Sequence, residues 1–372
     1  MIKRSVDSEL QEKTISILND QSINVGITSY IYDVYENLKA HGFSVNLHQF
    51  FADMNEKTYD SSTKIHHGYR LFGKYSQTAN ILLGIASRKL NKEKADIIHL
   101  SSPSLMKHIR DYSNLVLTVH DLCYLSHNSN SRIVSYYYKS TYNQLHKSKV
   151  VITVSNFTRQ ALIENSYVNE EDTFVSYPSI DTSFFYPRHY NFRSHFGFTE
   201  SDKVILHVGY DNPTKNLKGL YEILKALPDQ YKLIRVGKNF RGSLDYASKI
   251  GVMKKIKFLD SIERDQLPVV YNSADLFLFP SICEGFGIPP VEAMATGLPT
   301  FVSNNSSLPE VVGNGGFVLE SLDPKYVAGI IEDHLNDAKR LRDLSAKALK
   351  RAVFFSRDNQ LDSLTRAYKH VL

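Results

Sequence analysis

Residues 274–310 read ADLFLFPSICEGFGIPPVEAMATGLPTFVSNNSSLPE, and this stretch indicates the fold class of the chain. It begins with a short apolar run, Leu276 to Phe279, which is typical of a buried strand in a parallel sheet. A glycine-containing loop follows. Pro289 and Pro290 can then begin a helix, because the first helical NH groups need no partner inside the helix. The stretch predicts a strand, a loop and a short helix, with Glu292 in the first helical turn.

The loop and the helix start suit an anionic ligand that also carries hydroxyl groups. A helix that begins at the carboxyl end of a parallel strand offers unpaired NH groups and the positive end of its dipole. Glu284 and Glu292 lie eight residues apart, and each can accept hydrogen bonds from sugar or ribose hydroxyls. Gly285 and Gly287 let a ligand approach the backbone closely. For either glutamate alone, the simpler interpretation is an acidic residue that complements the helix dipole.

The complete pattern, E-G-F-G-x-P-x-x-E-A-M-A-x-G-x-P, closely resembles the E-x7-E signature of the retaining glycosyltransferases of family 4. Those enzymes use nucleotide sugars and have the α/β GT-B fold, in which two Rossmann-like domains face each other across a cleft. The resemblance covers nearly the whole chain. It implies an N-terminal acceptor-side domain over 1–187, a C-terminal nucleotide-sugar-binding domain over 188–355, and a terminal helix over 356–372 that returns to the N-terminal domain.

The composition fits a two-domain globular protein. A chain of 372 residues, with 42% hydrophobic and 22% charged residues, is long enough for two cores. No apolar run approaches the roughly 20 residues that span a bilayer, and the N-terminus lacks the apolar core of a signal peptide, so we expect a cytoplasmic protein. The net charge of +5 permits anionic partners such as nucleotide diphosphates and does not call for nucleic acid.

The first strand, loop and helix resemble the phosphate side of a nucleotide-binding fold. We predict a strand over 14–19 and a helix over 28–41. The resembling enzymes carry a glycine-rich loop between the two, whose backbone reaches the donor phosphate. This chain keeps only Gly26 of that loop, so a simple turn is the alternative role for this glycine.

Residues 64–94 form a basic segment in which seven lysine or arginine residues accompany a single acidic residue. Apolar residues lie between these charges. Such a segment can contact an anionic membrane face or a phospholipid-linked acceptor, which would place the protein peripherally at the cytoplasmic side of the membrane. The alternative is an amphipathic helix that packs on the sheet and leaves its basic face in water.

A histidine follows the predicted strand Leu115 to Val119. Open α/β sheets place ligand-contacting groups at the carboxyl ends of their strands. The motif T-V-H-D-L also resembles the family's strand end, where the histidine contacts the transferred sugar. The resemblance implies this catalytic role for His120 and, more weakly, for Asp121. The alternatives are a buried histidine with satisfied hydrogen bonds and an aspartate that caps the next turn.

The second half repeats the alternation of strands and helices, with a strand over 203–208 and a helix from about Leu217. The intervening loop matches the family element VGxxxxxKN. The resemblance implies that Lys215 binds the diphosphate as a point charge and that Asn216 lies near the donor; otherwise Lys215 is a solvated loop lysine. Many relatives place a second cation at one of two nearby positions, which here are Tyr210 and Thr214.

The resemblance assigns the remaining roles. It implies that Glu292 binds the ribose hydroxyls, that Glu284 and the Phe286–Gly287 backbone bind the transferred sugar, and that Ser307 lies near the donor. It implies a retaining hexosyl transfer from a nucleotide-diphosphate sugar to a glycan or lipid-linked acceptor, without a cofactor. The chain has no Asp-x-Asp motif, so we expect no metal. The alternatives are a non-catalytic sugar-nucleotide-binding subunit and a GT-B sugar-nucleotide epimerase.

Overall fold

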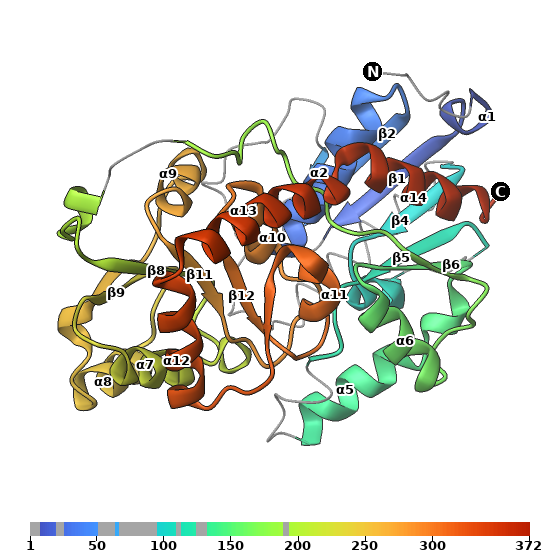
Figure 1. Cartoon of the computed structure of the whole chain (residues 1–372). Helices are drawn as coiled ribbons and strands as arrows, with labels where there is room; N and C mark the ends of the chain where they lie inside the picture. Colours follow the sequence, from blue (N-terminus) through green and yellow to red (C-terminus); the bar gives the residue numbers. More distant parts are fainter. Residues whose placement is uncertain are drawn as a thin grey trace. The chain divides into compact units, whose positions relative to one another are not determined.

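The computed structural model describes residues 8–19, 26–50, 64–66, 95–108, 113–123, 132–188 and 193–372. It divides the chain into two compact α/β units, shown in Figure 1. Unit 1 comprises residues 1–179 and 357–372, and unit 2 comprises residues 180–356. The boundary between the units lies after Ser179, before the boundary predicted near Pro187. The C-terminal helix belongs to unit 1.

Unit 1 contains a seven-stranded sheet in which every adjacent pair of strands is parallel. The strand order is β3-β2-β1-β4-β5-β6-β7. The strands are β1 (Thr14–Asn19), β2 (Ser44–Phe50), β3 (Lys64–His66), β4 (Ile97–Leu100), β5 (Leu115–Val119), β6 (Val150–Thr153) and β7 (Thr173–Val175). The helices are α1 (Ser8–Gln11), α2 (Gly26–Ala40), α5 (Arg132–Tyr142), α6 (Asn156–Glu164) and α14 (Arg357–Lys369), with 3-10 turns η1 (Pro103–His108) and η2 (Leu145–Lys147).

Unit 2 contains a six-stranded parallel sheet with the order β10-β9-β8-β11-β12-β13. Its strands are β8 (Lys203–Val208), β9 (Tyr231–Val236), β10 (Ile256–Leu259), β11 (Leu276–Phe279), β12 (Thr300–Ser303) and β13 (Phe317–Leu319). Its helices are α7 (Leu217–Ala226), α8 (Arg241–Lys249), α9 (Leu267–Tyr271), α10 (Ile288–Ala295), α11 (Leu308–Val312), α12 (Pro324–Leu335) and α13 (Ala338–Ala352). Its 3-10 turns are η3 (Arg193–Phe196), η4 (Pro213–Lys215), η5 (Met253–Lys255), η6 (Arg264–Gln266), η7 (Gly313–Gly315) and η8 (Val353–Phe355).

Both units have the doubly wound arrangement of a Rossmann-like domain. In unit 2 the main apolar core joins inward residues of the sheet to α7, α8 and α12, which lie together on one side of the sheet in Figure 1. Helix α10 packs against α11, α13 and β12, and α11 packs against β12 and β13. The chain order reverses between β8 and β11, which are neighbours in the sheet although β9 and β10 separate them in sequence. Such a reversal opens a crevice at the carboxyl ends of the strands.

Apolar periodicity also predicts helices over 326–349, 262–273 and 104–110, and the structure differs from all three. The helix expected over 326–349 is two helices, because Asp337 caps a new helix by accepting hydrogen bonds from the backbone NH groups of Lys339 and Arg340. The region 262–273 forms the short η6 and α9. The helix expected over 104–110 is the 3-10 turn η1 within the described residues. Capping residues and short turns divided or shortened the first two of these helices, which apolar periodicity alone did not indicate.

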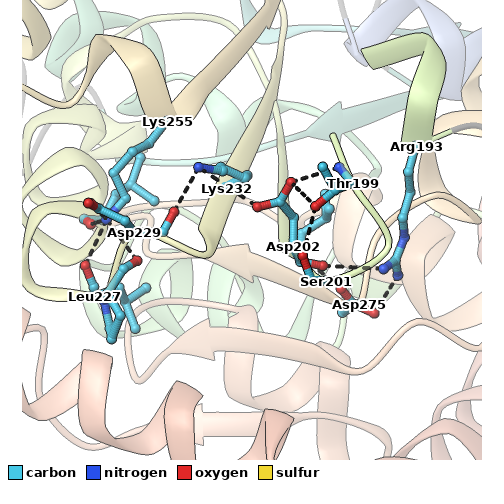
Figure 2. Close-up of polar contacts among 12 residues, drawn as sticks. Arg193, Thr199, Ser201, Asp202, Leu227, Asp229, Lys232, Lys255 and Asp275 are labelled. Atoms are coloured by element: carbon cyan, nitrogen blue, oxygen red, sulfur yellow. Dashed lines mark hydrogen bonds and ion pairs between the residues drawn. The ribbon is translucent and has the colours of Figure 1, made fainter. Parts of the chain in front are cut away.

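Ion pairs lie where several unit 2 strands begin: Arg193 pairs with Asp275, and Lys232 pairs with Asp202 (Figure 2). Asp275 precedes β11, where one carboxylate oxygen pairs with Arg193 at 2.5 Å and the other accepts from the Val204 NH at 2.7 Å. Lys255 donates to the carbonyls of Leu224, Leu227 and Pro228 at 2.9, 2.7 and 3.0 Å. This lysine therefore satisfies carbonyl groups at the C-terminus of α7.

Candidate functional site

The loops that follow β8 and β11 meet at the carboxyl edge of the unit 2 sheet. Asn212 caps η4 by accepting from the Lys215 NH at 3.2 Å. Asn216 has a left-handed backbone conformation (φ 54°), and its side chain caps α7 and donates to the Pro280 carbonyl at 3.2 Å. The Ile282 NH donates to the Thr214 carbonyl at 2.7 Å. The two loops are therefore joined by hydrogen bonds before any ligand binds.

An ion pair lies at the centre of this junction. Lys215 Nζ is 2.6 Å from Glu284 Oε1, and the two side chains are only 15% and 12% exposed. The Lys215 ammonium also lies 4.8 Å from the centre of the Phe279 ring. A charge pair with little solvent around it interacts strongly, so both side chains are held in place. The structure thus brings together two residues that the sequence assigned to the diphosphate and to the transferred sugar.

The backbone of the Glu284 loop is held by two serines. Ser306 Oγ accepts from the Glu284 NH at 2.9 Å, and Ser306 itself has φ 51°, which is uncommon outside glycine. Ser307 Oγ reaches the carbonyls of Glu284 and Phe286 at 3.1 and 2.9 Å. Ser307, predicted to lie near the donor, therefore positions the loop that carries Glu284.

Gly287 begins helix α10 in a conformation that only glycine adopts readily. Its φ is 104°, and a Cβ atom at this position would lie 2.9 Å from Leu308 Cδ2. Because α10 begins at Ile288, before the two prolines, Glu292 lies in the second helical turn and not in the first turn as predicted. The Phe286 ring is buried and packs edge-on against Phe355 at 5.3 Å, so the ring belongs to the packing of unit 2.

Glu292 accepts a hydrogen bond from Tyr271 Oη at 2.6 Å on Oε2. Burial raises the pKa of the Glu292 carboxyl above its ordinary value, although the Tyr271 hydrogen bond and the charge of Arg264 oppose this shift. Burial also raises the pKa of Tyr271 well above its ordinary value, with Glu292 adding to the effect. Tyr271 thus orients one carboxylate oxygen, and no hydrogen bond among the described residues uses the other.

His120 lies directly after β5 in unit 1 and is partly buried. Its Nε2 atom lies 3.0 Å from the Ser101 carbonyl, and the Tyr30 ring packs edge-on at 5.3 Å. Burial lowers the pKa of His120 to about 4, so the imidazole is neutral near pH 7. Since a carbonyl can only accept, Nε2 carries the proton and Nδ1 can accept a hydrogen bond from a hydroxyl.

The other predicted site residues of unit 1 have simpler surroundings. Asp121 Oδ1 accepts from the Cys123 NH at 2.9 Å, which is the arrangement of a turn cap. Gly26 begins α2, but the loop over 20–25 lies outside the described residues. The basic segment 64–94 is described only at Lys64–His66, which form β3; residues 67–94 lie outside the described part. Of the helices that the structure describes, none is long and apolar enough to cross a membrane.

Sequence reasoning missed three residues that organise the site. Tyr271 orients Glu292, Ser306 binds the Glu284 backbone, and Asn212 caps the turn that presents Lys215. The run Asn-Asn-Ser-Ser at 304–307 and the Asn-Pro pair at 212–213 are turn and cap signals that could have indicated two of them. The contact of Tyr271 with Glu292 had no such local signal.

Two family models match the chain, one in each half. The family described as Glycosyltransferase Family 4 matches residues 25–184, and the family described as Glycosyl transferases group 1 matches residues 190–351. The chain belongs to the family 4 glycosyltransferases. The second match includes Lys215, Glu284 and Glu292, and the first includes His120.

This chain is similar to curated bacterial proteins. It is 31% identical over 256 residues to the O-antigen chain mannosyltransferase B of Escherichia coli, covering 63% of this chain and 64% of that protein. It is 30% identical over 220 residues to the O-antigen chain mannosyltransferase RfbU of Salmonella typhimurium, covering 57% of this chain and 58% of that protein. These matches span less than two thirds of each relative.

Solved structures share the fold over almost the full length. Anabaena HepE, solved in complex with UDP and glucose, superposes with a TM-score of 0.77 at 20% identity, covering 95% of this chain and 99% of HepE. WaaG, a glycosyltransferase involved in lipopolysaccharide biosynthesis, gives a TM-score of 0.78 at 16% identity, covering 94% of this chain and 98% of WaaG. These comparisons and the two parallel sheets confirm the predicted GT-B fold.

Proposed function

We propose that this protein is a retaining hexosyltransferase that moves a sugar from a nucleotide diphosphate to a glycan or lipid-linked acceptor. The observation that carries the proposal is the Lys215–Glu284 pair, held at 2.6 Å where the order of the unit 2 strands reverses. Two relatives are named mannosyltransferases, so mannose is the first sugar to test. HepE holds UDP and glucose, which makes a uridine nucleotide the second donor to test.

The chemistry follows from where charge develops. Breaking the bond between sugar and diphosphate leaves additional negative charge on the diphosphate, and Lys215 is placed to stabilise it. Glu284 is then freed from Lys215 in part and can accept hydrogen bonds from sugar hydroxyls, together with the Phe286–Gly287 backbone. We assign the ribose hydroxyls to the oxygen of Glu292 that Tyr271 does not use.

The neutral His120 can accept a hydrogen bond from a hydroxyl of the transferred sugar through Nδ1. We propose that it orients the sugar, and that Gly26 lies near the donor phosphate. Attack on the face from which the diphosphate departs would retain the anomeric configuration. No step in this scheme requires a metal or another cofactor.

The test combines binding with turnover. Ligands that bind only the folded protein raise its melting temperature, so we expect GDP-mannose or a UDP-sugar to produce a clear shift. Product mass and proton NMR of the new linkage then identify the sugar and the anomer, with EDTA present to test metal independence. An inverted product or EDTA-sensitive turnover would contradict those parts of the proposal.

His120→Ala should lower kcat more than donor affinity, and equal losses in both would remove it from the chemical step.

A non-catalytic sugar-nucleotide-binding protein is the second candidate. The observation that favours it is Tyr210 and Thr214 at the two positions where relatives carry a second cation. Donor binding without hydrolysis or transfer to any glycan or lipid-linked acceptor would support this candidate.

We also propose that the enzyme works at the cytoplasmic face of a membrane through the basic segment 64–94. Flotation with liposomes that contain anionic lipid should recover the protein at low salt and lose it at high salt. Flotation that does not depend on lipid charge would leave the segment as a solvated basic surface.

A further inference from the structure

Strand β9 contains an arginine in the interior of unit 2. Arg235 is 0% exposed and lies on the same face of the strand as Tyr231 and Leu233, which belong to the apolar core that includes α7. Arginine is almost never fully buried unless its charge is paired. A guanidinium in this position therefore requires an explanation beyond the packing of the core.

The Arg235 guanidinium makes few direct polar contacts. One guanidinium nitrogen, Nη1, donates to the Val236 carbonyl, whereas Nε and Nη2 have no hydrogen-bond partner. Tyr221 Oη and both ring nitrogens of His207 also have none, and these side chains are fully buried. The nearby carboxylates are engaged elsewhere: Asp211 accepts from the Phe240 NH, and Asp260 accepts from the Asn239 amide. Arg235 therefore makes no direct ion pair among the described residues, although the charges of Asp211 and Asp260 and the neighbouring Tyr221 hydroxyl favour its ionised form.

This group of buried polar residues lies directly beneath the loop that carries Lys215. A Cβ atom on Gly237 would lie 2.2 Å from the Gly209 carbonyl oxygen and 3.0 Å from Arg235 Nη1. A Cβ atom on Gly209 would lie 3.5 Å from Lys215 Cε and 3.6 Å from His207 Cε1. Gly209 is therefore the point where all these groups meet, and its lack of a side chain lets the loop lie this close to Arg235.

The neighbouring aromatic and imidazole rings complete the connection. His207 pairs with Arg235 across β8 and β9, and its ring stacks on Phe279 at 5.5 Å and 25°. The Lys215 ammonium also lies over the Phe279 ring. Burial and the positive charges of Arg235 and Lys215 lower the pKa of His207 well below its ordinary value, so His207 is a neutral spacer between two cations.

We infer that Arg235 is the second cation of the donor site, acting from beneath the Gly209 backbone to strengthen binding of the donor diphosphate. Lys215 is already shared with Glu284, so it offers an incoming diphosphate less than a full positive charge. Arg235 supplies the charge that is absent at Tyr210 and Thr214. Because it does not reach the surface, it is a positioning residue that acts through its field in a region of low dielectric. The inference rests on the proposed nucleotide-sugar donor.

The test compares ligands that differ only in the diphosphate. Titration calorimetry with GDP and UDP, and saturation-transfer NMR with guanosine and uridine, are applied to the wild type, Arg235→Met, Arg235→Lys and Lys232→Met. Lys232 lies on the same strand at its other end and controls for loss of one positive charge. We expect Arg235→Met to weaken binding of the preferred diphosphate by about tenfold and to leave nucleoside binding unchanged. Arg235→Lys should recover most of the loss, and Lys232→Met should show none.

Equal weakening of nucleoside and diphosphate in Arg235→Met, or no weakening of either, would overturn the inference and make Arg235 a structural residue. Arg235→Gln, which keeps hydrogen-bond donors without the charge, replaces the methionine variant if that variant does not fold. A wild type that binds no nucleotide at all would contradict the proposed function itself. If the wild type binds a nucleoside diphosphate and Arg235→Gln binds it equally well, only the role of Arg235 is contradicted.

Discussion

At the scale of single residues, the pairing of Lys215 with Glu284 is the feature on which the donor site depends. Each side chain neutralises the other before a ligand arrives, which lets a lysine and a glutamate remain ordered with little solvent around them. A diphosphate presents anionic acceptor oxygens to the lysine, and a sugar presents hydroxyl donors to the glutamate. The free protein is therefore preorganised for both halves of the donor.

Lys215→Met should remove the stabilisation of the leaving diphosphate. We expect kcat/KM to fall by about 100-fold, the loss typical when one preorganised group at a developing charge is removed. Lys218→Met, three residues away on the exposed face of α7, is the matched control and should retain activity. Steady-state kinetics with the identified donor measure both variants. A Lys215→Met enzyme within twofold of the wild type would exclude this role.

Glu292 predicts a pH dependence of donor binding. The pKa of its carboxyl is raised by burial, so its protonation begins at a higher pH than for an exposed glutamate. A protonated carboxyl accepts fewer hydrogen bonds from ribose, so nucleotide affinity should be constant at high pH and fall by about tenfold as pH drops through the raised pKa. Titration calorimetry between about pH 8 and 5 checks this for nucleoside diphosphates.

The stability of the ligand-free protein should change with pH in the opposite direction to nucleotide affinity. Since the folded state binds this proton more tightly than the unfolded state, the contribution of Glu292 to stability grows as pH falls through the raised pKa.

Glu292→Gln should bind the nucleotide weakly at every pH. A pH profile of affinity in Glu292→Gln that matches the wild type would assign the dependence to another group.

At the scale of elements, the two edges of the unit 2 sheet have different tasks. The carboxyl ends of β8 and β11 carry the loops of the donor site, whereas the amino ends are held by partly exposed ion pairs and by Lys255. Polar networks at the amino edge fix where the strands begin, and hence where their carboxyl ends place Lys215 and Glu284. Substitutions at the two edges should therefore affect different measurements.

Lys255→Met should destabilise unit 2 without affecting donor affinity. The substitution leaves three carbonyl groups near the end of α7 without their donor, and each such group that water does not reach costs on the order of 1–3 kcal/mol. Lys254→Met is the matched control, because that neighbouring lysine is exposed. Urea denaturation gives the free energy of unfolding for each variant. Loss of nucleotide affinity in a folded Lys255→Met protein would contradict the separation of the two edges.

At the scale of the whole molecule, the chain completes its first unit only with its last helix. Helix α14 belongs to unit 1, where His99 Nδ1 lies 2.8 Å from the hydroxyl of Tyr368, and Asn37 donates to Gln360 Oε1 at 3.1 Å. Residues 180–356 therefore form a complete unit between two segments of the other. The stability of unit 1 depends on residues that the chain reaches more than 300 positions after β1.

Leu364→Ala tests this dependence. Leu364 is fully buried on α14, so the truncation should cost about 2–5 kcal/mol in the stability of unit 1. Differential scanning calorimetry should show a lower melting temperature for the variant than for the wild type. Arg366→Ala on the exposed face of the same helix is the control. A melting temperature equal to that of the wild type would contradict the dependence of unit 1 on α14.

Local pattern was sufficient for much of this protein. Short apolar runs such as Leu276–Phe279 predicted strands correctly, because a strand buried on both faces must be apolar along its length. The motif around Glu284 pointed to the family, and the two family models bear this out. Helix ends were less well predicted, as at Asp337, because a single cap outweighs the apolar periodicity around it.

Only the tertiary structure decided which residues meet. Lys215 and Glu284 are separated by 69 positions and become partners because β8 and β11 are adjacent in the sheet. Tyr271 reaches Glu292, and Arg235 lies beneath Gly209, through contacts that no local pattern contains. The sequence by itself determined the strands, the helices and the family motifs, since these depend on neighbouring residues. The pairs that make the site depend on strand order, which is fixed by the packing of the entire sheet.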